Sequence, residues 1–529
     1  MTRKKGQSKS KKAGLQKDDG ILPMGSGNKA GFAPAQSAVN VALNRFRNLL
    51  SPEEYDRLVE ELDLPLPPAL RINPLKSQPA ESVKAWRERY NWTLKSIAYE
   101  PAGWQVLSSP APISQTIEHR LGFYYIQDAA SMAPVALFDF DPSIDRPLIL
   151  DMAASPGGKT THLASRTGDQ GLIIANDASV SRLPALRIVL QNWGAINTAI
   201  TNYPGERFGT WYPEVFDRVL LDAPCSMQGL RSTESHPIRP ISDNEIQGLS
   251  QRQGRLLESA FKAVRPGGQV VYSTCTLTPD EDEAVVDGLL KHYPDLARVE
   301  DISAHFPAPV PGLISDGSHS FDPSLERSAR LWPHRLGTSG FFAALISKKD
   351  SLMGHLGREP HDRRPGNAFG LGGLTRLSPR QQSNLLDRFT QCYGFDFTNQ
   401  VENQGLILAQ RSSGANTRQI YSLPEIFAER FMDLRAHTLG LLFCEETPGG
   451  FVLSHEWAAR FGHRFTAGHF LLPEELVSHW IKGEDLPGIA AAAPPANPIV
   501  MVTDLSGRNL GRGKIQRERL KNLLPKRIL

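Results

Sequence analysis

The chain has 529 residues, of which 40% are hydrophobic and 22% are charged, with a formal net charge of +3. Because this length exceeds the size at which one hydrophobic core usually splits, we expect several folded domains. No run of about 18 apolar residues is present to span a bilayer, and the four cysteines stand at no spacing typical of a disulfide framework or a zinc site. The composition therefore indicates a soluble, cytoplasmic protein with free thiols, no metal and no membrane partner.

The N-terminal region divides into a basic arm and a small domain. The first 17 residues contain seven Lys or Arg and no acid, and residues 1–35 lack apolar periodicity, so we expect a disordered arm that either contacts phosphates or aids solubility. Helical spacing follows at residues 38–62, then a short strand at Ala69–Ile72 and a helix at Glu81–Glu88. We expect an α+β domain over residues 36–122.

Strand and helix alternate from Pro147 onward. The apolar runs LILDM, LIIAND, FDRVLLD and QVVYST predict strands, and helical patterns follow the first two runs and precede the last one near Ser250–Val264. This alternation predicts an α/β domain over residues 123–349, with a mostly parallel sheet covered by helices on both faces.

The pattern of the remaining residues predicts a linker and two small modules. Residues 350–376 are dense in Gly, Arg, His and Pro and predict a linker. Strand-like runs such as LILAQ, GFVLS and IVMVT alternate with helical segments beyond it, which predicts an α+β module at residues 377–432 and an α+β or β-rich module at residues 433–529. The last 24 residues carry eight Lys or Arg against one acid.

A glycine-rich turn follows the first strand of the α/β domain. Its residues are Ala153, Ala154, Ser155, Pro156, Gly157, Gly158 and Lys159. Such a turn presents backbone amides and a helix N-terminus to a ligand, but its glycine spacing matches neither the dinucleotide fingerprint nor a P-loop, which disfavours NAD and ATP. Asp177 closes the next strand, where a carboxylate either binds ribose hydroxyls or caps the following helix.

Two cysteines carry the chemistry that the sequence suggests. Cys225 in DAPCS and Cys275 in YSTCT each follow an apolar run that predicts a core strand. Carbon 5 of cytosine becomes nucleophilic only after a thiolate adds to carbon 6, and a second thiol would assist release of the adduct. Two thiols in one pocket suit this cycle, although small cysteines also pack at strand ends for structural reasons alone.

Two charged residues accompany the cysteines in the sequence. Asp222 precedes Cys225 by three positions, so its carboxyl would protonate or hydrogen-bond nitrogen 3 of a cytosine, or else cap the strand end. Lys159 would lower the pKa of a nearby thiol or hold a cofactor, or else remain a solvated helix lysine.

The segments LDMAASPGGKT, DAPCS and GGQVVYSTCTLTPDEDE, in this order, closely resemble motifs of the RNA cytosine-5 methyltransferases of the NOL/NOP/Sun family. RINPLK, FYYIQDAAS and RLWPHRLGTSGFF extend the resemblance over residues 71–348. The tail, which includes GLLFCEETPGGFVLSHEWAARFGH, resembles the C-terminal extension of bacterial members that modify small-subunit ribosomal RNA. That extension resembles a PUA-type RNA-binding module.

The resemblance implies a Rossmann-like methyltransferase core between an N-terminal RNA-binding domain and a C-terminal PUA-like RNA-binding domain. It also implies S-adenosylmethionine as the methyl donor, held by residues 153–159, Asp177 and Asp222. In this family the later cysteine attacks, so Cys275 is the expected nucleophile and Cys225 the thiol that assists release. DNA cytosine-5 methyltransferases are expected to attack from the counterpart of Cys225, so the presence of both cysteines favours the RNA family.

Three residues depart from the family pattern. Pro204 stands where relatives often have an Asp that contacts adenine, Met227 where Gly is usual, and Ser339 where an acid is frequent. The adenine contact is therefore left to Asn202 or to backbone groups. We expect a monomeric enzyme that makes 5-methylcytosine in small-subunit ribosomal RNA. Transfer RNA is the competing substrate, and a non-catalytic RNA-binding ribosome-assembly factor is the rival function.

Overall fold

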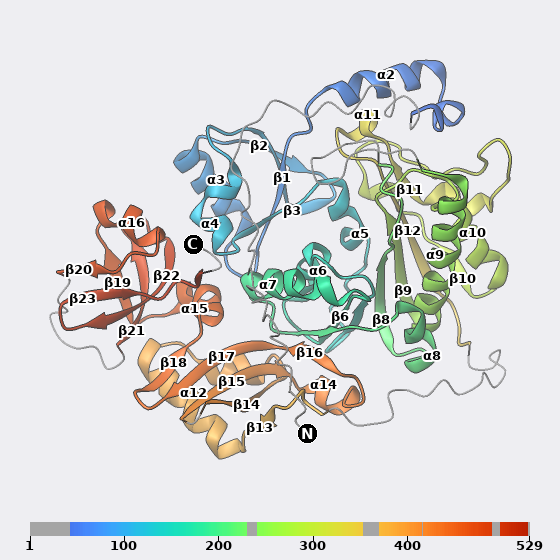
Figure 1. Ribbon diagram of the computed structural model, residues 1–529. Coiled ribbons are helices and arrows are strands. Elements are labelled where there is room, and N and C mark those ends of the chain that lie inside the picture. The colour runs from blue at the N-terminus through green and yellow to red at the C-terminus, as the bar shows by residue number, and fades with distance from the viewer. Residues whose placement is uncertain (1–42, 230–240, 353–369, 415, 489–497, 527–529) are drawn as a thin grey trace, which may run out of the picture.

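The computed structural model describes residues 43–229, 241–352, 370–414, 416–488 and 498–526, which form four β-sheets (Figure 1). The basic arm expected at residues 1–35 and most of the linker expected at residues 350–376 lie outside these ranges. No helix within the described ranges is long and apolar enough to cross a membrane.

The N-terminal part is an α+β unit, as the sequence predicts. Its antiparallel sheet has the order β2 (Thr93–Ile97), β3 (Glu100–Ser108), β1 (Ala69–Ile72) and β4 (Tyr124–Ile126). Helix α2 (Pro52–Asp63) begins at the Ser51 cap, whose hydroxyl accepts a hydrogen bond from the Glu54 amide. Helix α3 (Pro79–Tyr90) packs Val83 and Trp86 into the core that the sheet forms with Tyr124.

The central sheet has a parallel middle and antiparallel flanks. Its parallel strands follow the order β9 (Val264–Thr274), β8 (Phe216–Asp222), β5 (Leu148–Asp151), β6 (Leu172–Asn176) and β7 (Thr198–Thr201). The antiparallel strands are β12 (Phe341–Lys348), β10 (Ala297–Val299) and β11 (Ala329–Leu331) at one flank, and β16 (Ala436–Leu439) at the other.

Helices cover both faces of the central sheet, which confirms the predicted Rossmann-like α/β fold. Alternate strand residues point to opposite faces, so Leu150 and Ile149 lie in two different cores. One core includes α8 (Phe208–Trp211), α9 (Asp243–Ala263) and α10 (Glu283–His292). The other includes α5 (Ala133–Ala136), α6 (Gly158–Thr167) and α7 (Leu183–Trp193).

Two five-stranded sheets form the C-terminal part. The third sheet has the order β13 (Thr375–Arg376), β14 (Leu406–Gly414), β15 (Thr417–Pro424), β17 (Leu441–Thr447) and β18 (Gly450–Leu453). It packs against α12 (Pro379–Tyr393), α13 (Phe397–Glu402) and α15 (His455–Phe461). Helix α14 (Glu425–Arg430) instead joins the core of the central sheet.

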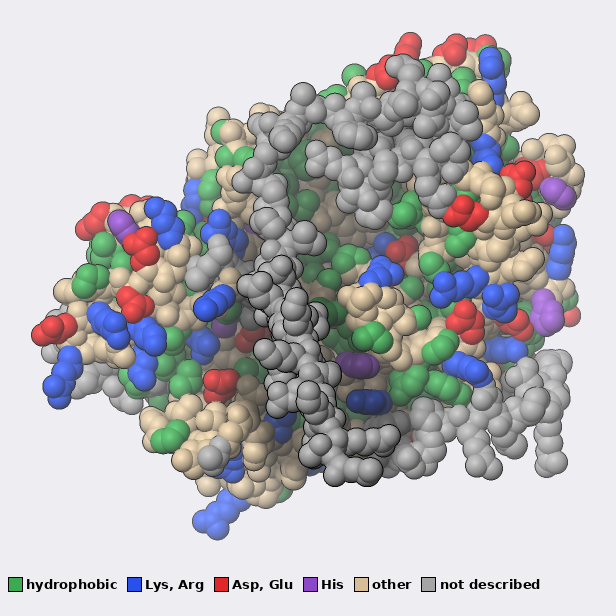
Figure 2. All heavy atoms as spheres, in the orientation of Figure 1, with side chains coloured by type: hydrophobic (Ala, Val, Ile, Leu, Met, Phe, Trp, Pro, Cys, Tyr) green, Lys and Arg blue, Asp and Glu red, His purple; other side chains and the backbone are tan. Residues whose placement is uncertain are grey.

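The fourth sheet is the PUA-like, β-rich extension that the sequence predicts. Its order is β19 (His469–Leu472), β21 (Ile499–Asp504), β22 (Asn509–Gln516), β23 (Arg519–Asn522) and β20 (Leu486–Pro487). Helix α16 (Glu474–Ile481) covers it through Val477 and Trp480. Several Lys and Arg side chains gather over this sheet, at the left of the view in Figure 2.

The sheets extend across two domain boundaries that the sequence led us to expect. Strand β4 belongs to the N-terminal sheet although it lies beyond residue 122, and the third sheet continues to Leu453, beyond residue 432. Strand β16 lies between β15 and β17 in the sequence but pairs with β7 of the central sheet. We therefore propose domain divisions near residues 129, 352 and 466, which follow the sheets.

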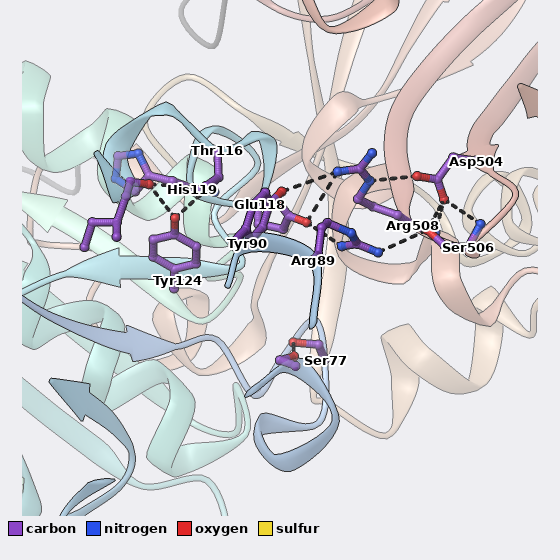
Figure 3. Close-up of polar contacts among 12 residues, drawn as sticks. Ser77, Arg89, Tyr90, Thr116, Glu118, His119, Tyr124, Asp504, Ser506 and Arg508 are labelled. Atoms are coloured by element: carbon purple, nitrogen blue, oxygen red, sulfur yellow. Dashed lines mark hydrogen bonds and ion pairs between the residues drawn. The ribbon is translucent and has the colours of Figure 1, made fainter. Parts of the chain in front are cut away.

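An ion network joins the fourth sheet to the N-terminal domain (Figure 3). The buried Glu118 carboxylate accepts hydrogen bonds from Arg89 Nη1 at 2.8 Å and from the Tyr90 hydroxyl at 2.5 Å. Its Oε1 also lies 3.7 Å from Nη1 of Arg508, whose Nε donates to Asp504 at 2.8 Å. The first and last domains are thereby held together beside a groove of about 460 Å³.

Replacing Glu118 with Gln should loosen the fourth sheet from the N-terminal domain. The change removes the anionic partner of two arginines, and a hydrogen bond to a charged group contributes about 1.5–3 kcal/mol. We expect faster amide hydrogen exchange in β21 to β23. Glu81→Gln is the control, because Glu81 is exposed and lines the same groove. Equal exchange in both variants would contradict the role of the network.

Candidate active site at the carboxyl edge of the central sheet

The segments that carry the predicted site residues meet where β5, β8 and β9 end. Asp151 is the last residue of β5, Asp222 the last of β8, and Thr274 the last of β9. In the register of the parallel sheet, Asp222 lies opposite Ser273. Because parallel strands end at one edge, the glycine-rich turn and both cysteine segments come together there, as the sequence predicts.

The two cysteines lie in contact at this edge. Their Sγ atoms are 3.2 Å apart, and both thiols are free, with Cys225 half-buried and Cys275 exposed. The hydrogen bond from Cys225 lowers the pKa of Cys275 below its usual value of 9.0, and the charge of Lys159 acts in the same direction, against burial and Asp222. The same hydrogen bond and burial raise the pKa of Cys225 well above that value. Of the two thiols, Cys275 is therefore the one that ionises more readily.

Lys159 and Asp222 form an ion pair beside the thiols. Lys159 Nζ donates to Asp222 Oδ2 at 2.8 Å, and the Ser273 hydroxyl donates to Oδ1 at 2.8 Å. Burial opposes the charge of Lys159, but Asp222, with smaller contributions from Cys275 and Asp151, outweighs burial and leaves the pKa of the lysine above its usual value. Lys159 is thus a fixed ammonium group at this edge, not a solvated lysine.

A buried carboxylate, Glu281, supports both cysteine segments. It accepts hydrogen bonds from the Ser226 amide at 2.9 Å and from Gln253 Nε2 at 3.0 Å, and Gln253 also donates to the Pro224 carbonyl at 3.0 Å. The Ser226 hydroxyl reaches Thr276 at 3.2 Å. The residues on either side of Cys225 are therefore tied to Glu281 and to the residue after Cys275.

Glu281 and Gln253 are not among the site residues that the sequence predicts. Glu281 lies in the acidic run TPDEDE, and such a run usually forms a solvated surface. Here Glu281, Asp282 and Glu283 are all fully buried, and the last two pair with the buried Arg330. Arg330 belongs to the segment RLWPHRLGTSGFF. A basic residue in this distant motif is the signal in the sequence that could have indicated a partner for the buried acids.

The glycine-rich turn wraps back onto the end of β6. The Ala154 amide donates to the Asn176 carbonyl at 2.7 Å, and the Ser155 amide donates to Asp177 Oδ2 at 3.2 Å. Gly157 has φ 114°, a left-handed conformation that favours glycine, and α6 begins at Gly158. Loop and helix N-terminus are therefore fixed against the neighbouring strand.

The Asp177 carboxylate caps the turn after β6, which is one of the two roles that the sequence left open, and its contact with a ribose stays a prediction. Its Oδ1 accepts a hydrogen bond from the Ser179 amide at 2.8 Å, which caps the turn after β6, while its Oδ2 faces the glycine-rich turn. Arg182 Nη1 lies 3.4 Å from the same Oδ2. Arg182 is not among the site residues that the sequence predicts.

The three departures from the family pattern lie near this edge. Met227 has φ 56° and a side chain that is 49% exposed, so a methionine occupies a conformation that favours glycine. Asn202 Nδ2 donates to the Asp177 carbonyl at 2.6 Å, next to the turn that begins at Pro204. The Ser339 hydroxyl donates to Asp128 Oδ2 at 3.0 Å.

Comparison with known proteins places the chain in a family. Residues 140–347 match the family model described as 16S rRNA methyltransferase RsmB/F, and residues 42–129 match the N-terminal domain of 16S rRNA methyltransferase RsmF. Ribosomal RNA small subunit methyltransferase F of Erwinia tasmaniensis is 32% identical over 481 residues, which cover 90% of this chain and 93% of that relative. The chain belongs to the RsmB/F methyltransferase family. The enzyme of the same name from Aeromonas salmonicida is 30% identical with the same coverage.

A solved structure supports the fold of this family member. The crystal structure of a methyltransferase homolog protein from Pyrococcus horikoshii superposes with a TM-score of 0.51 and 29% identity, covering 60% of this chain and 99% of that one. Membership confirms the resemblance to Sun-type enzymes and the methyltransferase core, with S-adenosylmethionine as cofactor. Within the described ranges, no group of three or more His, Cys, Asp or Glu is arranged to hold a metal ion.

Alkylation should reveal how the two thiols share a proton. We expect iodoacetamide to label Cys275 with a rate that rises with pH and levels off above a midpoint below 9.0, because the thiolate is the reactive form. Cys225→Ala removes the hydrogen bond and should move this midpoint to higher pH. Peptide mass spectrometry across a pH series measures the rate, and Cys392→Ala is the control in a distant domain. An unmoved midpoint in Cys225→Ala would show that the thiols are not coupled.

Proposed function

We propose that this protein transfers a methyl group from S-adenosylmethionine to carbon 5 of a cytosine in small-subunit ribosomal RNA, through a covalent bond between Cys275 and carbon 6. The observation that carries the proposal is the pair of thiols 3.2 Å apart, with the Lys159–Asp222 ion pair beside it. Methylation of adenine or of a ribose hydroxyl needs no thiol nucleophile, whereas methylation of cytosine at carbon 5 does. The RNA class rests on the names of the relatives, which act on small-subunit ribosomal RNA.

The residues at the sheet edge fit the cofactor. The turn of residues 153–159 would hold it at the N-terminus of α6, and the buried Asp177 would accept ribose hydroxyls. Asp151 Oδ1 is a buried oxygen without a hydrogen-bond partner at the same edge. Val180 follows Asp177 by three positions and is 62% exposed. It would offer an apolar surface for the adenine, since Pro204 stands where relatives often have an acid that contacts it. When bound, S-adenosylmethionine supplies an electrophilic methyl group.

The chain's own groups would carry the remaining steps. The Cys275 thiolate forms a bond to carbon 6, and the ring electrons move toward nitrogen 3, where the Lys159–Asp222 pair supplies a proton as negative charge develops. Carbon 5 is then enamine-like and gains the methyl group. In the release step the carbon 5 proton passes to a base and finally to solvent, its electron pair re-forms the carbon 5–carbon 6 double bond, and Cys275 leaves carbon 6 as a thiolate. Cys225 assists this step.

The fourth sheet supplies charge that suits an RNA backbone. Lys514 and Lys521 are register partners on β22 and β23, so their side chains leave the sheet on one face. Like charges directly opposite each other are destabilising, and a phosphate backbone would neutralise them. Because a stacked cytosine is out of reach, the target base must be unpaired or flipped out while the flanking domains hold the RNA.

Bisulfite sequencing of total RNA from cells with and without the gene tests this function. 5-Methylcytosine resists conversion, so we expect one protected cytosine of small-subunit ribosomal RNA to be lost on deletion. The wild-type gene should restore it, and a Cys275→Ala gene should not. An unchanged map would favour the rival function of a non-catalytic assembly factor. Loss of a protected position from transfer RNA would show that transfer RNA is the substrate.

The release step can be tested separately with Cys225→Ala. This variant should form the adduct but release it slowly, so that a protein–RNA complex survives denaturing electrophoresis after incubation with S-adenosylmethionine and unmodified ribosomal RNA. The double variant Cys225→Ala/Cys275→Ala is the matched control and should show no complex. If Cys225→Ala turns over normally and traps no RNA, Cys225 has no part in release.

A further inference from the structure

Arg71 of the segment RINPLK reaches from the N-terminal domain into the methyltransferase core. It lies on β1, where Leu70 and Ile72 point into the core of the N-terminal domain. Because side chains alternate along a strand, Ala69 and Arg71 point the other way, and Ala69 joins a core of the central sheet. Arg71 is fully buried, so its guanidinium lies between the two domains.

The guanidinium holds the start of the helix that follows the glycine-rich turn. Arg71 Nη2 donates to the Gly158 carbonyl at 2.8 Å and to the Thr161 hydroxyl at 2.7 Å, and its Nε donates to Gln127 Oε1 at 3.1 Å. It also stacks on the Trp193 ring at 4.6 Å. Burial lowers the pKa of Arg71 to about 10, so the side chain remains charged at neutral pH.

Gly158 is fixed by the N-terminal domain from a second direction. A Cβ at this position would meet Cε1 of Tyr125 at 2.8 Å, so the Tyr125 ring of β4 closes the space above the glycine. The last two residues of the turn, Gly158 and Lys159, are thus set against the N-terminal sheet on one side and Asp222 on the other.

Stability alone does not explain how the Arg71 guanidinium is oriented. The buried Glu100 carboxylate is close enough to favour its charge, but the groups that Arg71 hydrogen-bonds are carbonyl, amide and hydroxyl oxygens. Replacing a buried ion pair with apolar side chains is often neutral or stabilising. A cation beside the first turn of α6 also opposes the helix dipole. A well-packed apolar side chain would serve the interface better, whereas a planar group with several donors fixes the direction of the loop.

We propose that Arg71 is a positioning residue for the cofactor loop, so that the N-terminal domain sets the affinity of the core for S-adenosylmethionine. This inference rests on the proposed binding of the cofactor by residues 153–159. Arg71 acts through Gly158 and Thr161, and makes no contact with the reacting atoms itself. The RINPLK segment therefore joins the two domains at the point where the cofactor loop turns into α6.

Titration calorimetry of the full chain with S-adenosylmethionine and S-adenosylhomocysteine tests the proposal. Arg71→Lys keeps the charge but cannot bridge the same acceptors, and we expect Kd to rise about tenfold, equivalent to about 1.4 kcal/mol. Lys76→Met is the matched control. Lys76 lies in the same segment and donates to the carbonyls of Leu121 and Asn192. Asn192 stands at the C-terminal end of α7, remote from Arg182 and the cofactor loop at the other end of this helix. Loss of the Lys76 ammonium group should lower Tm and leave Kd within about twofold.

Each outcome decides one question. An unchanged Kd in Arg71→Lys, or an equal rise in Lys76→Met, would overturn the role of Arg71, since the second result reports general loosening between domains. If Arg71→Lys does not fold, Thr161→Val removes one acceptor of the guanidinium within α6, and an unchanged Kd there overturns the proposal. Absence of binding to the wild-type chain would instead overturn the assignment of the cofactor site.

Discussion

The parallel register between β8 and β9 places the two thiols of the candidate site next to each other. Asp222 lies opposite Ser273 in this register, so the segments that follow the strands carry Cys225 and Cys275 to the same point. A slip of one residue would turn the side chains of one strand to the other face of the sheet. The ion pair of Lys159 depends on the same alignment, because β5 brings the glycine-rich turn to β8.

The sequence was informative where structure depends on neighbouring residues. Strands such as β5 and β6 are continuous apolar runs, as buried parallel strands must be, and their ends locate the loops. Pairings between distant segments leave no such pattern. Three of the four residues of β16 are exposed or partly exposed, and β16 joins a sheet whose other strands end by residue 348. The third sheet reaches β18 through β17, which pairs with β15 although α14 and β16 lie between these two strands in the sequence.

The site residues divide along a similar line. The groups to which we assign direct roles stand in local motifs and could be named from the sequence, whereas the groups that support them could not. Glu281 and Gln253 meet through tertiary packing of α9 against the loop after β9, and no local pattern distinguishes a buried acid from a solvated one. The hydrogen bonds of this network hold the segment after β8 against the segment after β9.

The pairing of β16 with β7 has a consequence for synthesis of the chain. Strand β7 ends at residue 201, but its partner begins at residue 436. At about 5–20 residues per second, the ribosome needs on the order of 10–50 s to make the intervening chain. During this interval β7 is an open edge that can pair with other chains. The nascent enzyme therefore passes through a period in which aggregation competes with folding, and only the C-terminal half of the chain ends it.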